Sequence, residues 1–172
     1  VHVTAHLGGG VGRALSRVAK YRAESKSAVV EERFICLEKP EKLQYIDILR
    51  ESGITVKIPE TQEEFDSQLL EADIVQLEWW HHPLVYAWMA KKQGPKMRLI
   101  IWAHTSGLHF PAIPKPVVHL PHAFLFTTPV SLSTSGTNLQ DHISETKNFI
   151  GVVHSSGGFS DIPHSTRNYT NG

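Results

Sequence analysis

The chain has 172 residues, with 17 basic and 17 acidic side chains and 41% hydrophobic residues. This composition is typical of a globular chain with one well-filled core, and it excludes fibrous, collagen-like and wholly disordered classes. The formal net charge of zero gives no general attraction for nucleic acid, so no nucleic-acid partner is expected. The single cysteine, Cys36, excludes an intrachain disulfide framework and a multi-cysteine zinc site.

No apolar run approaches the ~18 residues that a membrane helix needs. The first residues, Val1 to Thr4, carry no readable targeting signal and no initiator methionine, so we expect a cytoplasmic chain that is a piece of a longer protein. A small basic patch would not change the net charge. Peripheral contact with a membrane surface therefore stays open.

Short β-branched runs alternate with helical periodicity along the chain. This alternation predicts an α/β fold, with a Rossmann-like, doubly wound and mostly parallel sheet. The expected strands are residues 1–6, 33–37, 55–58, 73–77, 99–103, 123–127 and 149–153. The expected helices begin near Val11, Pro40, Glu63 and Pro83, because apolar residues recur there at helical spacing or proline suits the first turn.

Two segments carry no periodicity. Residues 104–122 contain four prolines and are predicted to form a long loop of the kind that is usually functional or disordered. Residues 157–172 are rich in Gly, Ser, Thr and Asn, which is typical of a linker or a disordered end. The predicted domain therefore spans residues 1–156.

A glycine-rich loop follows the first strand, where a doubly wound sheet binds its ligands. It contains Gly8, Gly9, Gly10 and Gly12. Glycines let a ligand approach the backbone, and the unpaired N–H groups of a helix start favour an anion such as a phosphate. Position 13 is Arg, so the G-x-G-x-x-G dinucleotide fingerprint is incomplete. The alternative is a tight turn that binds nothing.

His104 follows the apolar strand 99–103, which we expect to be central. Its imidazole would stand at the mouth of the cleft and hydrogen-bond a substrate hydroxyl. Glu78, Trp79 and Thr105 also follow predicted strands, and we expect them at the same substrate. The alternatives are a loop histidine bonded to backbone and a tryptophan that packs as a cleft wall.

Zinc ligation by His81, His82, His104 or His109 is open on ligand chemistry. However, no H-E-x-x-H motif is present, and no carboxylate stands at ligand spacing between these histidines. No metal site is therefore predicted. A nucleophilic serine is not indicated either, because G-x-S-x-G is absent.

Three segments, in this order, resemble the N-terminal domain of family 4 retaining glycosyltransferases of the GT-B fold. They are TAHLGGGVGRAL (residues 4–15), ADIVQLEWW (72–80) and WAHTSG (102–107). The likeness spans about residues 1–158. It implies a two-domain enzyme whose active site lies in the cleft between two Rossmann-like domains, with this domain on the acceptor side.

The resemblance also implies roles for particular residues. The glycine loop, Gly8 to Gly12, would lie near the donor phosphates and the acceptor, and His104 would contact the transferred sugar. The implied partners are a nucleotide-diphosphate sugar as donor substrate and a sugar or lipid-linked acceptor, with no separate cofactor. A nucleotide-binding domain with an E-x7-E carboxylate pair is expected after residue 172, so the isolated fragment is expected to be inactive.

Two other classes of function stay open. An NAD(P)-dependent oxidoreductase would use Glu38, after the second strand, to hold a ribose hydroxyl, although no Tyr-x-x-x-Lys motif is present. A non-catalytic binding module would use Trp79, Trp80 and the loop 104–122 as an interaction surface.

Overall fold

Seven parallel strands form one sheet. The computed structural model describes residues 1–25, 30–91, 95–133 and 138–155, so the predicted end segment 157–172 lies outside the described residues. The strands are β1 (His2–Thr4), β2 (Arg33–Cys36), β3 (Thr55–Lys57), β4 (Val75–Trp79), β5 (Leu99–Ala103), β6 (Ala123–Phe126) and β7 (Phe149–Val152). Their order is β3-β2-β1-β4-β5-β6-β7, and every neighbouring pair is parallel. The predicted α/β, Rossmann-like doubly wound fold is confirmed.

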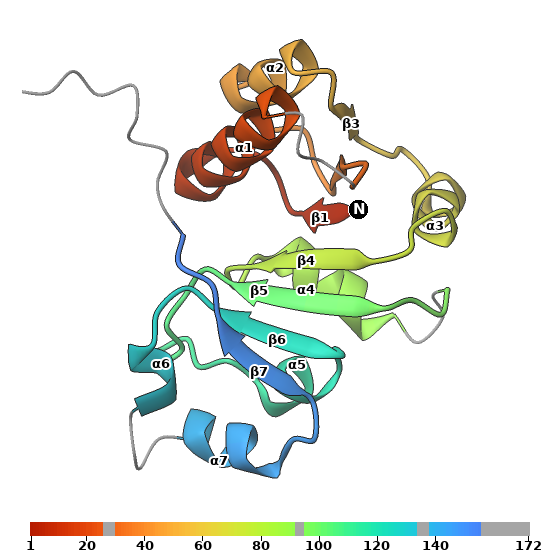
Figure 1. The fold of residues 1–172 in the computed structure, drawn as a ribbon. Coiled ribbons are helices and arrows are strands. Elements are labelled where there is room, and N and C mark those ends of the chain that lie inside the picture. Colours follow the sequence, from red (N-terminus) through yellow and green to blue (C-terminus); the bar gives the residue numbers. More distant parts are fainter. Residues whose placement is uncertain (26–29, 92–94, 134–137, 156–172) are drawn as a thin grey trace, which may run out of the picture.

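Helices pack against both faces of the sheet. They are α1 (Gly9–Glu24), α2 (Gln44–Glu51), α3 (Gln62–Leu70), α4 (Pro83–Ala90), α5 (Lys115–His119), α6 (Val130–Ser133) and α7 (Asn138–Glu145). Leu15 of α1 and Leu49 of α2 belong to a core on one face, whereas Phe65 of α3, Val85 of α4 and Val117 of α5 belong to the core on the other. Figure 1 shows α1 and α2 together on one side of the sheet, and α5 and α7 on the other.

The direction of winding reverses between β1 and β4. From β1 the chain moves outwards to β2 and β3, then returns to β4 beside β1 and continues to β7. At such a point the loops leave the strand ends in opposite directions, which opens a crevice beyond the carboxyl ends of the strands. The glycine loop follows β1 and Trp80 follows β4, so both stand at this crevice.

The fourth strand ends two residues later than the sequence predicts. It covers Val75–Trp79 instead of 73–77, because Val75, Leu77 and Trp79 are all buried while Ile74 is 47% exposed. Side chains alternate between the faces of a strand. The shift therefore places Glu78 and Trp79 inside the sheet, on opposite faces, and makes Trp80 the first residue beyond it.

Helical structure departs from the predictions in several places, and α6 and α7 were not predicted at all. The second helix begins at Gln44, after a loop in which Pro40 is buried, and not at Pro40. The segment 104–122 is not a continuous loop, because α5 lies within it. Proline is favoured in the first turn of a helix, and Pro116 occupies that turn while Val117 and Val118 pack into the core. Among the described residues, no helix is long and apolar enough to cross a bilayer.

Candidate functional site at the carboxyl ends of the strands

The glycine loop joins β1 to α1 by a tight turn. Gly9 has a φ of +65°, a conformation that side chains other than glycine disfavour. A Cβ at Gly12 would lie 2.2 Å from the carbonyl oxygen of Leu7, whereas a Cβ at Gly10 would meet nothing within 4 Å. Gly12 is therefore needed for the fold, and Gly10 leaves open space at the start of α1. No acidic side chain stands in the first turn of α1, so its free N–H groups keep their attraction for an anion.

A pocket of about 550 Å³ lies beside this loop. It is lined by the end of β1, the glycine turn and the segment that follows β2, with residues His6, Gly8, Gly9, Glu38, Lys39, Glu41 and Lys42. The charges of Lys39 and Lys42 are balanced by those of Glu38 and Glu41, so any attraction for a negatively charged ligand comes from the start of α1.

His6, Glu38 and His82 gather at the edge of this pocket, with ligand-type atoms within 4.8 Å of one another. Nδ1 of His6 accepts the N–H of Gly8 at 2.9 Å, and Nδ1 of His82 accepts the N–H of Leu84 at 3.3 Å. A neutral imidazole that accepts a hydrogen bond at Nδ1 carries its proton on Nε2.

Both Nε2–H groups therefore face Oε1 of Glu38, at 4.0 Å from His6 and 3.3 Å from His82. A metal ion would need the lone pairs of these same Nε2 atoms, and both backbone hydrogen bonds would be lost on ligation. We therefore assign His6 and His82 to holding Glu38 beside the glycine loop.

Trp80 connects the pocket to the end of β5. Its ring makes edge contacts with His6, His82 and His104, at centroid distances of 5.7, 6.2 and 6.4 Å. Trp79 has no exposed surface and packs in the core, against Tyr86. Of the two tryptophans, Trp80 lies at the site. Trp79 lies in the core and has no exposed surface with which to contact a substrate, contrary to the expectation from the sequence.

Glu78 is fully buried, and its carboxylate is surrounded by N–H donors. Oε2 lies 2.7 Å from Nε2 of His104, and Oε1 lies 2.9 Å from Nδ1 of His2 and 2.8 Å from the amide nitrogen of Gln76. Burial alone would raise the pKa of Glu78, but the hydrogen bonds from His104 and His2 outweigh it and lower that pKa. Glu78 is thus an ionised group without direct access to a ligand, unlike the substrate contact that the sequence suggested.

His2 extends this arrangement towards the surface. Its Nε2 lies 3.5 Å from Glu32, which also pairs with Arg22. Burial works to lower the pKa of His2, but the hydrogen bonds to Glu32 and Glu78 raise it overall. Because both ring nitrogens face carboxylates, the doubly protonated, cationic form of His2 is favoured.

His104 stands at the end of β5 with 6% of its side chain exposed. Its Nε2 is taken by Glu78, and the ring lies against Trp102 at a centroid distance of 4.7 Å. Nδ1 has no hydrogen-bond partner in the described part of the chain. Next to it, the hydroxyl oxygen of Thr105 also lacks a partner there, but it is buried, so Nδ1 of His104 is the side-chain atom at this strand end that is available to a ligand.

The structure thus gathers part of the expected set of residues. Gly8, Gly9, Gly10, His104 and Thr105 lie at one edge of the sheet, Gly12 supports the turn, and Glu78 and Trp79 lie inside it. His104 is not among the residues that line the 550 Å³ pocket. The sequence reasoning missed His6, which it placed inside the first strand, and it named Trp80 only as part of a binding surface. It also missed His2, whose partner Glu78 is 76 residues away.

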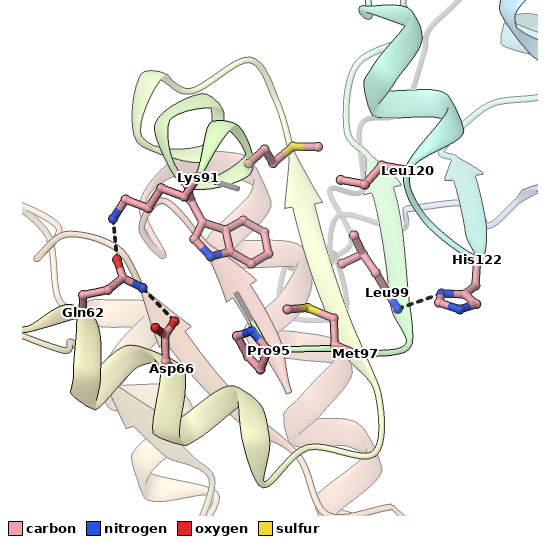
Figure 2. A pocket seen from close by; sticks show the side chains of 10 residues that line it. Gln62, Asp66, Lys91, Pro95, Met97, Leu99, Leu120 and His122 are labelled. Atoms are coloured by element: carbon pink, nitrogen blue, oxygen red, sulfur yellow. Dashed lines mark hydrogen bonds between the residues drawn. The ribbon is translucent and has the colours of Figure 1, made fainter. Parts of the chain in front are cut away.

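A second pocket, of about 270 Å³, lies beside the amino-terminal ends of β5 and β6 (Figure 2). Its polar side chains already bind one another, since Lys91 donates to Gln62, Gln62 donates to Asp66 at 2.7 Å, and His122 accepts the N–H of Leu99 at 3.2 Å. Its other walls are largely apolar. The polar atoms available to a ligand are at the opposite end of the sheet, which makes that end the better candidate.

Comparison with models of known protein families, with curated proteins and with solved structures finds no match for this chain. The fold class therefore rests on the strand order and the two helical layers. What the chain does has to be inferred from the chemistry of the residues at the carboxyl ends of the strands.

Proposed function

We propose that this chain is the acceptor-side, N-terminal domain of a nucleotide-sugar-dependent retaining glycosyltransferase of the GT-B type. One observation carries the proposal. The glycine loop and His104, which come from strands that are not neighbours, lie at the same edge of the sheet and are connected through the rings of His6 and Trp80. The resemblance of residues 4–15, 72–80 and 102–107 to that family supports the same conclusion.

Each part of this edge suits a step of sugar transfer. Negative charge builds on the leaving phosphate as the bond to the sugar breaks, and the N–H groups at the start of α1, a turn without acidic side chains, favour that charge. The open space at Gly10 lets the phosphate and the acceptor oxygen approach the backbone.

His104 is assigned to the donor sugar. Its Nδ1 is available to accept a hydrogen bond from a sugar hydroxyl, and Trp80 beside it supplies an apolar surface for a ring. These groups form one wall of a cleft. Transfer also requires that water be excluded and the nucleotide held, so activity is expected from the protein with its second domain and not from residues 1–172 alone.

One observation favours an oxidoreductase as the second candidate. Glu38 follows β2 and lines the same pocket as Gly8 and Gly9, which is where a dinucleotide-binding fold places the carboxylate that holds a ribose. However, Oε1 of Glu38 already faces Nε2–H of His82 at 3.3 Å, and Arg13 interrupts the glycine fingerprint.

A ligand titration separates the two candidates. The full-length protein is heated in the presence of UDP- and GDP-sugars, their nucleotide diphosphates, or NAD(H) and NADP(H), and the unfolding temperature is followed. A rise with a nucleotide sugar, followed by transfer of labelled sugar to an acceptor, supports the glycosyltransferase. A rise with the nicotinamide dinucleotides alone contradicts it and supports the oxidoreductase.

A further inference from the structure

We propose that Glu78 is a positioning residue that fixes the tautomer of His104, so that His104 carries its proton on Nε2 and offers Nδ1 to the ligand as a hydrogen-bond acceptor. The inference rests on the site of the proposed function, and deepens it by naming the atom that meets a hydroxyl group of the substrate. It depends on the three side chains that surround one buried carboxylate.

The two oxygens of Glu78 are not equivalent. Oε1 accepts two hydrogen bonds, from Nδ1 of His2 at 2.9 Å and from the amide of Gln76 at 2.8 Å. Oε2 accepts one, from Nε2 of His104 at 2.7 Å. An ionised carboxylate can only accept, so each of these nitrogens must present an N–H.

Arg22, Glu32, His2 and Glu78 form a row of paired charged side chains, and the charges in this row balance without His104. With His2 protonated, Arg22 and His2 are the cations, Glu32 and Glu78 are the anions, and they alternate from the surface to the interior. Buried charges are tolerated when they are paired and hydrogen-bonded. A neutral His104 therefore completes the row, and its single proton lies on Nε2 because Glu78 requires a donor there.

Replacing Glu78 by glutamine should reverse the tautomer. The amide oxygen of the new side chain belongs at the position of Oε1, where it keeps two donors, from His2 and Gln76. Its NH2 group then takes the place of Oε2 and faces Nε2 of His104. Two donors cannot face each other, so the proton of His104 has to move to Nδ1.

The test is the nitrogen NMR spectrum of the full-length protein labelled with ¹⁵N-histidine, recorded without substrate. The signal of His104 is assigned by its loss in His104→Gln. In the unchanged protein we expect Nε2 as the protonated nitrogen, and in Glu78→Gln we expect Nδ1. Glu71→Gln is the matched control, because it makes the same chemical change at an exposed carboxylate that pairs with Arg33, and it should leave His104 unchanged.

Two results would overturn the proposal: an Nδ1–H tautomer of His104 in the unchanged protein, or an Nε2–H tautomer that persists in Glu78→Gln. The first measurement needs no variant, so the proposal stays falsifiable if Glu78→Gln does not fold. Because no substrate is present, tautomer reversal in a protein that transfers no sugar would sink the proposed function and leave this inference standing.

A second test measures kcat, and it becomes possible once sugar transfer by the full-length protein has been detected. Glu78→Gln should lower kcat roughly 10-fold or more, as expected when a hydrogen-bonding group is lost at the reacting centre. The double variant Glu78→Gln/His104→Ala should be no slower than His104→Ala alone, because Glu78 acts through His104. Additive losses would mean that Glu78 has an independent role and would contradict the proposal.

Discussion

The imidazole ring of His2 lies flat against the ring of Phe34, with centroids 4.5 Å apart and planes inclined by 10°. This stacking holds the ring in place while its two nitrogens face Glu32 and Glu78. An aromatic face also favours a cation. The charged form of His2 is thus stabilised by the folded protein, which makes the stability of the protein dependent on pH.

His2→Gln tests this dependence. The pKa of His2 is raised in the folded protein, so its contribution is fully present below the unfolded value of about 6.5 and is lost as the pH rises through the folded value. The difference in unfolding free energy between the unchanged protein and His2→Gln should therefore shrink above about pH 6.5, by up to ~1.4 kcal/mol per pH unit. Urea denaturation between pH 5 and pH 9 measures it, and a constant difference would contradict the paired cation.

Glu78 and Glu32 shift in the opposite sense. Their pKa values are lowered, so their contributions are present above the ordinary carboxyl range and are lost as the pH falls through the folded values. Removing the charge of Glu78, the fully buried member of the row formed with Arg22, Glu32 and His2, should lower the unfolding free energy substantially. Glu78→Gln is expected to lower the unfolding free energy at pH 6 by about 3–5 kcal/mol, the range for a broken buried pair. A loss no greater than that of exposed Glu71→Gln would argue against the row.

Gly12→Ala and Gly10→Ala form a matched pair in the first turn of α1. The Cβ that Gly12→Ala introduces would overlap the carbonyl group of Leu7, so we expect a loss of about 1–3 kcal/mol in unfolding free energy. Gly10 has open space, and alanine there should leave the stability unchanged or raise it by up to ~1 kcal/mol. Thermal unfolding of both variants measures the contrast, and equal effects would show that the turn is not packed as described.

The thiol of Cys36 should be unreactive in the folded protein. Burial raises its pKa to about 12, so only a trace of thiolate exists at pH 8. Reaction with an aromatic disulfide reagent should be roughly 1000-fold slower than in the chain unfolded in urea. A comparable rate in both states would contradict the buried position of Cys36.

His104→Ala should lower kcat for sugar transfer more than ~10-fold in the full-length enzyme, because a group that bonds the reacting sugar is lost. His109→Ala is the control, since His109 is an exposed histidine of the same loop region. Circular dichroism checks that both variants fold. An unaltered kcat in His104→Ala would remove His104 from the site.

The alternation of strand-like and helical patterns was enough to predict the sheet and its two helical layers, because each parallel strand is a short apolar run. The position of β4 was harder. Its sequence from Asp73 to Trp80 has apolar residues on both sides of Glu78, and local pattern does not show that a carboxylate can be buried. That becomes clear only when His2 and His104, far apart in the chain, are seen on the same face.

The same limit explains the site. Because β4 ends at Trp79 and not at Leu77, the side chains of Glu78 and Trp79 are buried instead of facing a ligand. Trp80 is the residue of this segment that lies beside His104. His104 was predictable because the apolar run of β5 ends at Ala103, and the glycine loop was predictable from its composition, although β1 ends at Thr4 and not at residue 6. Helix α5 was not, since the prolines around it obscure one buried turn at Val117 and Val118.

The close approach of α1 to the carbonyl group of Leu7 at Gly12 has a consequence for recognition. This contact fixes the distance between α1 and the sheet. The backbone N–H groups of the first turn of α1 are therefore in position before a ligand binds. A ligand that binds there does not have to order the first turn of α1. The conformational entropy of that turn is lost when the protein folds and not when the ligand binds.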